Sequence, residues 1–263
     1  MESLNRMSVI VKDNGFGIKN IIINEPKTYN SLSFKTLNIL INIFRRLEND
    51  NKTRVIILSG NGKGFSAGHN LKEVGGIKNR SNHLKLFNLC SKLMMKIVEG
   101  KKPVIAKVHG AAYAAGCQLA ASCDLAYSTT TAKFATPGVN IGLFCSTPMV
   151  AVSRKVTRKI MMKMLLTGEP INAKYAKDIG LINDCYSSKK LNSEVLKIAK
   201  TISSKSNLTI KIGKQAFYKQ LEMPLGDAYK FTSKMMTLNM ASQDAKEGIS
   251  AFLQKRKPNW KNK

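Results

Sequence analysis

The stretch Gly110-Ala-Ala-Tyr-Ala-Ala-Gly-Cys-Gln-Leu-Ala-Ala-Ser-Cys-Asp124 decides the fold. It follows an apolar run, Pro103–Val108, that has the composition of a buried strand. Small residues fill the turn, and helical spacing begins near Ala115. A strand that ends in such a turn before a helix leaves backbone N–H groups without partners, and the helix dipole favours negative charge beside them. The stretch therefore predicts a place for a developing oxyanion, although Gln118, where an acid or base would be useful, is neither.

The first two-thirds of the chain alternates predicted strands with predicted helices. Apolar runs predict strands at 8–11, 18–23 and 55–58, and Ser33 precedes a run with helical spacing. The polar stretch 75–82 has the composition of a mobile loop. Alternation of this kind favours an α/β fold with parallel strands joined by crossovers. From about Ser193 the pattern is nearly all helical, so we expect a core over 1–193 and a helical region of the same domain over 194–263.

The charge balance is strongly basic, with 43 Lys and Arg against 16 Asp and Glu and a net charge of +27. One interpretation is a protein that binds nucleic acid or another polyanion. The other is a composition rich in Lys, Asn and Ile whose charges lie on solvated faces. We favour the second, because the cations are dispersed and no ladder of aromatic residues lies among them. A cationic surface would still attract a ligand that carries several phosphates.

Composition excludes several other classes of protein. No apolar run reaches the ~18–20 residues that span a bilayer, and the segment 1–7 resembles neither a signal peptide nor a transit peptide. We expect no metal site, because the spacing of the cysteines matches no metal motif. Reduced thiols inside a cell fit their odd number, five. They are Cys90, Cys117, Cys123, Cys145 and Cys185.

A second loop is built like the first. Ala67-Gly-His69 and Ala114-Ala-Gly116 both leave a predicted strand with small side chains. One N–H group from each loop could converge on a single carbonyl oxygen and stabilise an oxyanion. The alternative is tight packing between helix and strand, for which small residues are equally suited.

Several blocks of the chain resemble the crotonase (enoyl-CoA hydratase/isomerase) superfamily. Phe65–Glu73, Gly110–Asp124 and Phe134–Gly142 are similar to its three signature blocks. The similarity extends over essentially the whole chain and is strongest to the mitochondrial enoyl-CoA hydratase domain-containing branch. Further similar blocks are Asn24–Leu32, Leu166–Ala173 and Glu247–Pro258.

The resemblance implies a ClpP/crotonase-type spiral of ββα units with two sheets and a C-terminal helical trimerisation region. It implies homotrimers, which often pair into hexamers, and an acyl-CoA ligand in fatty acid metabolism. Coenzyme A would arrive as part of the thioester substrate, with no tightly bound cofactor. The resemblance also implies a mitochondrial location, and the cytoplasm is the alternative because no transit peptide is visible.

The resemblance also assigns roles to single residues. The N–H groups of His69 and Ala115 would hold the thioester oxygen. Residues of three blocks would bind coenzyme A. Lys27, Thr28, Ala67 and Leu71 would flank its arm, and Phe252 and Lys255 would reach the coenzyme A of a neighbouring subunit.

Two departures from the family pattern bear on the mechanism. Hydratases of this family place two glutamates beside the substrate double bond, and the matching positions here are Gln118 and Gly138. An amide and a glycine exchange no proton, so we do not expect hydration by the two-glutamate mechanism. Three functions stay open. The protein could be a hydratase-like lyase with other oxyanion chemistry, or a non-catalytic acyl-CoA-binding or regulatory protein. It could also be an RNA-binding member of the superfamily.

Three side chains near the expected oxyanion site have two interpretations each. The His69 ring could hold a substrate carboxylate, or only its backbone N–H could act while the ring faces solvent. Cys145 could place a thiol near the acyl group, or be a small packed residue. Gln118 could orient a water or an acyl oxygen, or simply fill the space of a glutamate.

Overall fold

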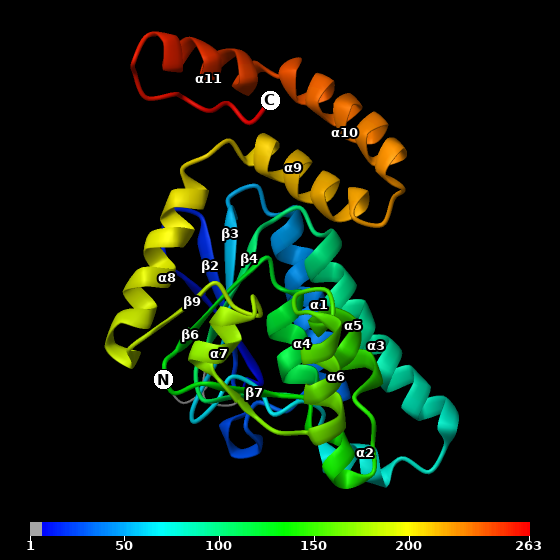
Figure 1. The fold of residues 1–263 in the computed structure, drawn as a ribbon. Helices are drawn as coiled ribbons and strands as arrows, with labels where there is room; N and C mark the ends of the chain where they lie inside the picture. The colour runs from blue at the N-terminus through cyan, green and yellow to red at the C-terminus, as the bar shows by residue number, and fades with distance from the viewer. Residues whose placement is uncertain (1–6) are drawn as a thin grey trace.

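A six-stranded sheet runs through the centre of the molecule (Figure 1). The computed structural model describes residues 7–263. The first two strands form an antiparallel hairpin, and all later neighbours in this sheet pair in parallel. In spatial order the strands are β1 (Val9–Asp13), β2 (Ile18–Ile23), β3 (Val55–Gly60), β4 (Val104–Val108), β6 (Leu125–Thr129) and β9 (Asp184–Tyr186).

A second, three-stranded sheet lies where the signature blocks meet. Its order is β5 (Ala111–Tyr113), β7 (Lys133–Ala135) and β8 (Ile171–Asn172). Single bridges tie two further segments to this region, Ser66 to Ala112 and Leu32 to His69. Two sheets with crossover helices confirm the mixed α/β architecture expected from the resemblance.

The larger sheet alternates its side chains between two apolar clusters. Ile21, Ile56 and Ala106 face the main core, which also receives the buried sides of the helices on that face. Ile57 and Ile105 face the opposite way. The helices of the main body are α1 (Phe34–Asn49), α2 (Leu71–Gly76), α3 (Arg80–Glu99), α4 (Ala115–Ser122), α5 (Ser146–Val152), α6 (Arg158–Thr167) and α7 (Ala173–Asp178).

Helix α8 (Ser188–Ser203) covers that opposite face of the sheet. Its buried residues Leu191, Val195 and Ala199 pack against the strands. The boundary predicted between 193 and 194 therefore falls inside a helix that belongs to the sheet. The helices that follow are the ones that leave the sheet.

Three C-terminal helices stand beside the main body at the top of Figure 1. They are α9 (Asn207–Gln220), α10 (Leu225–Met240) and α11 (Gln243–Leu253). Large apolar side chains on them are exposed, among them Tyr229 and Phe252. Among residues 7–263, no helix has the length and apolar character needed to cross a membrane.

The prediction of a mobile loop over 75–82 is wrong for most of that stretch. Helix α2 runs through Gly76, and α3 begins at Arg80. The reason is capping, because the Asn70 side chain accepts hydrogen bonds from the first turn of α2, and Asn79 accepts one from the Ser81 N–H. Asparagine caps outweigh the polar composition that suggested a loop.

Candidate functional site

Two backbone loops touch at the N-terminal end of α4. A Cβ at position 116 would lie 2.1 Å from the Ser66 carbonyl oxygen, so only glycine fits there. Gly68 has a φ of +92°, and a Cβ there would lie 3.0 Å from the Ala115 nitrogen. The structure thus brings Ala67–His69 and Ala114–Gly116 together, a close approach that their small residues allow.

Two N–H groups at this contact are unused. Neither the His69 N–H nor the Ala115 N–H donates a hydrogen bond to any group of residues 7–263, whereas Ala114 donates to the Ala135 carbonyl oxygen at 2.9 Å. Ala114 itself has φ +49° and ψ −119°, a conformation that costs an alanine about 1–3 kcal/mol. Unsatisfied donors beside a strained turn mark a place where a ligand acceptor is stabilised.

The His69 ring is held inside the protein. Its Nδ1 lies 3.2 Å from the Leu32 carbonyl oxygen, and because a carbonyl only accepts, Nδ1 carries the hydrogen. The ring meets Phe87 edge-on with 5.5 Å between centroids. Nε2 is buried and has no partner in the described part of the chain. Burial lowers the pKa of His69, which favours the neutral ring. The interpretation in which this ring faces solvent is therefore wrong.

The two positions that match the family's glutamates carry no acid. Gln118 is only 3% exposed, and the Cys90 thiol points at its Oε1 from 4.0 Å. A Cβ at position 138 would lie 2.6 Å from the Leu143 carbonyl oxygen and 2.9 Å from the Cys145 sulfur. Position 138 therefore lacks a carboxylate and also has no room for a side chain, because atoms of the surrounding loop occupy that space.

Cys145 is a packed residue in this structure. Its sulfur accepts a hydrogen bond from the Gly138 N–H at 3.3 Å, and the residue is 7% exposed. Burial raises the pKa of its thiol, and it raises the pKa of Cys117 to about 12. Because the thiolate is the nucleophile, both thiols are poorly reactive at neutral pH.

The residues assigned to the coenzyme A arm fall into two separate groups. Lys27 and Thr28 lie in the short 3-10 turn Pro26–Thr28, which is tied to the Ala67 loop because the Ala67 N–H donates to the Tyr29 carbonyl oxygen. Leu71 opens α2 directly after this loop. Phe252 and Lys255 lie on and after α11, at the opposite end of the molecule from α2 (Figure 1). Within one chain they do not meet the other four.

Comparison with known proteins shows which family this chain is related to. The family model for enoyl-CoA hydratase/isomerase matches residues 13–263. The chain belongs to the enoyl-CoA hydratase/isomerase family. Human enoyl-CoA hydratase domain-containing protein 3, mitochondrial, is 48% identical over 244 residues, which cover 93% of this chain and 80% of the relative. Mitochondrial enoyl-CoA hydratase of Pongo abelii is 32% identical, with 95% of this chain and 85% of the relative covered.

Solved structures give the same result. The crystal structure of the human domain-containing protein 3 matches with a TM-score of 0.94 and 46% identity, over 97% of this chain and all of that one. An enoyl-CoA hydratase of Mycobacterium smegmatis matches with a TM-score of 0.95 and 42% identity, over 97% and 99%. The recognition of the crotonase fold from sequence blocks is thereby confirmed.

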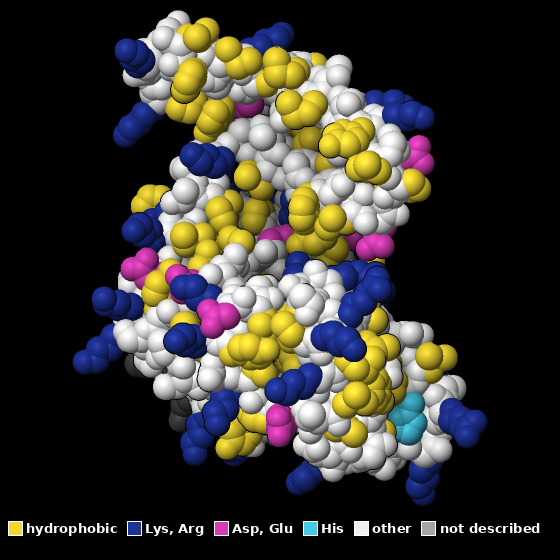
Figure 2. Space-filling model, in the orientation of Figure 1, with side chains coloured by type: hydrophobic (Ala, Val, Ile, Leu, Met, Phe, Trp, Pro, Cys, Tyr) yellow, Lys and Arg dark blue, Asp and Glu magenta, His cyan; other side chains and the backbone are white. Residues whose placement is uncertain are grey.

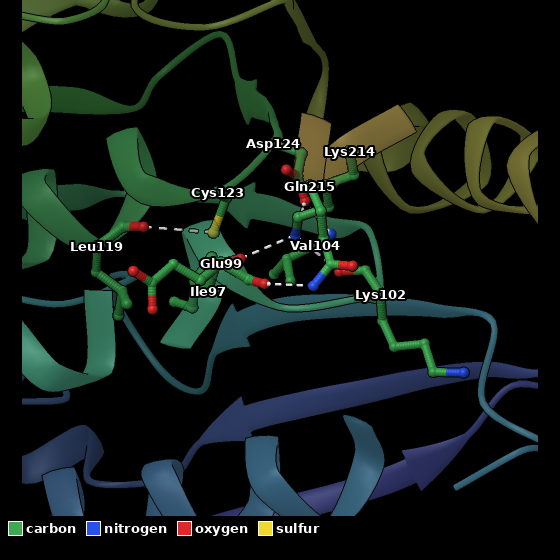
Figure 3. A network of polar contacts seen from close by, with 9 residues as sticks. All are labelled: Ile97, Glu99, Lys102, Val104, Leu119, Cys123, Asp124, Lys214 and Gln215. Carbon is green, nitrogen blue, oxygen red and sulfur yellow. Dashed lines mark hydrogen bonds and ion pairs between the residues drawn. The ribbon is translucent and has the colours of Figure 1, made fainter. Parts of the chain in front are cut away.

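The C-terminal end of α4 in this enoyl-CoA hydratase/isomerase family member holds a buried ion pair (Figure 3). Lys214 of α9 lies 2.8 Å from the Asp124 carboxylate, which also accepts the Val104 N–H at 2.7 Å. Lys214 donates to the carbonyl oxygens of Ile97 and Lys102 as well. The sequence patterns did not indicate this pair, because nothing local to Lys214 distinguishes it from the other lysines.

A cavity of about 870 Å³ lies between α3, α4, α5 and α9, and we call it the α3–α9 cavity. Its size falls in the range of small-molecule sites. Gln118 lines it, which places the cavity one helical turn from Ala115. No sequence pattern indicates this cavity, because its walls come from four separate helices. Its apolar lining includes Met94, Met95, Val98, Ala121, Val150 and Leu221.

Proposed function

We propose that this protein binds an acyl-CoA thioester and holds the thioester oxygen between the His69 and Ala115 N–H groups. The observation that carries the proposal is the contact between the two loops, at which both donors are unused within residues 7–263. Two such donors in a site with little water stabilise a developing oxyanion, each by ~2.7–4 kcal/mol of barrier.

The coenzyme A arm is proposed to lie along the rim formed by Lys27, Thr28, Ala67 and Leu71. These residues are exposed, and they adjoin His69 through the Tyr29–Ala67 hydrogen bond. A lysine at this rim suits the phosphates of coenzyme A. The excess of 27 positive charges favours the approach of such a ligand from a distance.

Hydration by two glutamates is not part of the proposed activity. Gln118 and Gly138 supply no proton donor or acceptor, and the closed loop around Gly138 leaves no room to bind a substitute there. The proposal is therefore acyl-CoA binding with a polarised thioester carbonyl, which serves either oxyanion chemistry of another kind or non-catalytic capture of the thioester.

We also propose that the chain associates with copies of itself and that it acts in mitochondria. Exposed apolar side chains on α9–α11, such as Phe217 and Phe252, favour contacts with further copies of the chain. A trimer or hexamer would let Phe252 and Lys255 reach the coenzyme A of a neighbour. The names of several relatives support a mitochondrial location.

The cationic side chains on the face drawn in Figure 2 do not favour RNA binding. Figure 2 shows Lys and Arg spread over the whole visible face, with no single basic stripe. Binding that depended on RNA phosphates would weaken steeply with salt. Acyl-CoA binding is the function that the arranged residues favour.

The test is a calorimetric titration with butyryl-CoA and with free coenzyme A, together with an assay of crotonyl-CoA hydration. We expect butyryl-CoA to bind more tightly than free coenzyme A, and hydration to stay near background. Equal binding of the two ligands would contradict the thioester site. Robust hydration that survives Gln118→Ala would overturn the exclusion of hydratase chemistry.

A further inference from the structure

We propose that a cluster of four cations at the N-terminal edge of the larger sheet binds a phosphate-bearing anion, with a diphosphate group as the preferred ligand. The cations are Arg54, Lys101, Lys102 and Lys211, and we call them the Lys102 cluster. The diphosphate is either a free anion or part of a nucleotide. This site is separate from the thioester site and does not depend on the proposed function.

The strand register places Arg54 beside Lys102. Strands β3 and β4 are parallel neighbours with Ile56 opposite Val104, and the Ile56 N–H donates to the Pro103 carbonyl oxygen at 2.9 Å. Arg54 and Lys102 each lie two residues before that pair, so they stand opposite each other where the strands begin. Because neighbouring strands are about 4.8 Å apart, two cations meet at this edge of the sheet.

Helix α9 brings a third cation to the same place. Lys214 donates to the Lys102 carbonyl oxygen at 2.9 Å. The next residue, Gln215, donates to the Glu99 carbonyl oxygen at 3.3 Å, so this face of α9 packs over the start of β4. Lys211 lies one turn earlier on the same face, since residues three and four apart are neighbours on a helix. Its side chain is partly buried there.

Lys102 is a buried cation without an acid partner. The residue is only 6% exposed, although buried lysines are almost always paired. None of the ion pairs within residues 7–263 includes it, and its side chain points away from Asp124 and Lys214 (Figure 3). Its Nζ is not among the fully buried side-chain atoms that lack a partner in the described chain, so a ligand can reach it.

The surroundings of Lys102 hold a surplus of positive charge. Burial lowers its pKa, and the Asp50 carboxylate opposes that shift. Repulsion by the other three cations of the cluster lowers the pKa further. Four cations therefore share the influence of one carboxylate, and an anion that entered the cluster would relieve their repulsion.

The acceptors beside the cluster are already used. Asp50 accepts the Lys52 N–H at 3.0 Å and the Thr53 hydroxyl at 2.6 Å. Arg54 donates through Nη2 to the Lys205 carbonyl oxygen, but its Nε is buried and has no acceptor within residues 7–263. Buried donors are nearly always satisfied, so this corner of the protein supplies too few acceptors for the cations that it holds.

The charge of the cluster favours phosphate groups over a single carboxylate. One carboxylate ligand would leave most of the positive charge unbalanced. A diphosphate carries several negative charges and more acceptor oxygens, and both guanidinium and ammonium groups bind phosphate oxygens strongly.

The cluster is also remote from the thioester site. The Ala67–His69 loop follows the C-terminal end of β3, whereas Arg54 precedes its N-terminal end. The six residues from Arg54 to Gly60 span about 20 Å in an extended strand. A ligand at the cluster and an acyl-CoA at His69 should therefore bind together.

The test is a calorimetric titration with pyrophosphate at about 0.15 M salt, at which exposed charges more than about 8 Å apart are largely screened. We expect one pyrophosphate per chain. Lys102→Met and Lys211→Met should each weaken binding by at least about tenfold, because each removes a hydrogen bond between charged groups. Lys163→Met removes the same charge from an exposed position on α6, away from the cluster (Figure 1), and should change the affinity by less than about twofold.

Three outcomes would overturn the site: no binding of pyrophosphate, an equal loss in Lys163→Met, or displacement of pyrophosphate by butyryl-CoA. Lys211 is partly exposed, so its variant keeps the test decisive even if Lys102→Met does not fold. Failure of butyryl-CoA to bind, with pyrophosphate still bound at the cluster, would refute the proposed function and leave this site intact.

A titration with ADP distinguishes the two sources of the diphosphate. Tighter binding of ADP than of pyrophosphate would assign the group to a nucleotide, and weaker binding would assign it to the free anion. In either case Lys211→Met should weaken the binding of ADP by at least about tenfold. Binding of ADP that is unchanged in Lys211→Met would contradict a nucleotide at the Lys102 cluster.

Discussion

The polar groups at the two ends of α4 differ in whether they have hydrogen-bond partners. At the N-terminal end, the Ala115 N–H and the neighbouring His69 N–H have no acceptor within residues 7–263, and Ala114 is strained. At the C-terminal end, the Asp124 carboxylate receives the Val104 N–H and the Lys214 ammonium. One short helix therefore carries an unsatisfied site and a fully satisfied one.

This difference in hydrogen bonding indicates that the N-terminal end of α4 is a ligand site and that the C-terminal end is structural. Buried polar groups without partners destabilise a fold unless a ligand or water completes them, whereas a buried ion pair with further hydrogen bonds only fixes the elements that it joins. We infer that α4 is held from its C-terminal end so that its N-terminal end can bind. Substitutions at the two ends should thus separate stability from binding.

The largest effect is expected from Lys214→Met. The change leaves the Asp124 carboxylate without its cation, and removal of one partner of a buried pair costs about 3–5 kcal/mol. Chemical denaturation measures the loss. Lys230→Met, an exposed change on α10, should alter the free energy of unfolding by less than about 0.5 kcal/mol. Loss of butyryl-CoA binding in the still-folded Lys214→Met protein would contradict the separation of the two ends.

The complementary change is Gly116→Ala at the other end of α4. The added Cβ meets the Ser66 carbonyl oxygen at 2.1 Å, so the two loops must separate. We expect a loss of about 1–3 kcal/mol in stability and at least about tenfold in butyryl-CoA affinity. Calorimetry on the folded fraction measures the affinity. Gly75→Ala is the control, since its Cβ meets no atom within 4 Å. Unchanged affinity in Gly116→Ala would contradict the oxyanion assignment.

The next prediction concerns the two former glutamate positions. Gln118→Glu with Gly138→Glu restores the family's residue types, but the second side chain has no space beside the Leu143 carbonyl oxygen. The double variant should lose about 1–3 kcal/mol of stability and gain no hydration of crotonyl-CoA. Gln118→Glu alone serves as the control for the buried acid. Hydratase turnover in the double variant would show that the loop around Gly138 opens readily.

Local patterns predicted much of the fold and drew attention to the two loops that meet at the start of α4. The start of α4 near Ala115 and the Ser33 cap follow from small residues, capping and helical spacing, and the structure confirms them. The strands β8 and β9 were missed, because two- and three-residue strands are too short to show a period.

Long-range contacts account for what the sequence did not show. Lys214 meets Asp124 across 90 positions of the chain. The closure of the Gly138 position depends on the carbonyl oxygen of Leu143, a backbone atom whose location no residue type reveals. The α3–α9 cavity needs four helices in place before it exists.

The smallest effect is expected at a third charged site, far from α4. Glu247 accepts hydrogen bonds from Arg256 and from the Asn259 N–H, and these lower its pKa from 4.5 to about 2. The pKa is lowered on folding, so the contribution is complete above pH 4.5 and is lost as the pH falls toward about 2. Fluorescence of Trp260, the single tryptophan, should report release of the C-terminal tail in that window. Glu247→Gln should lack the transition, and its persistence there would assign it to another group.

The most direct measurement compares butyryl-CoA with its thioether analogue S-butyl-CoA, which lacks the carbonyl oxygen but keeps the chain and the coenzyme A arm. If the His69 and Ala115 N–H groups hold that oxygen, the thioester should bind at least about fivefold more tightly, since each hydrogen bond contributes about 0.5–1.5 kcal/mol. Equal affinity for the two compounds would show that the unused donors at the end of α4 do not bind the thioester.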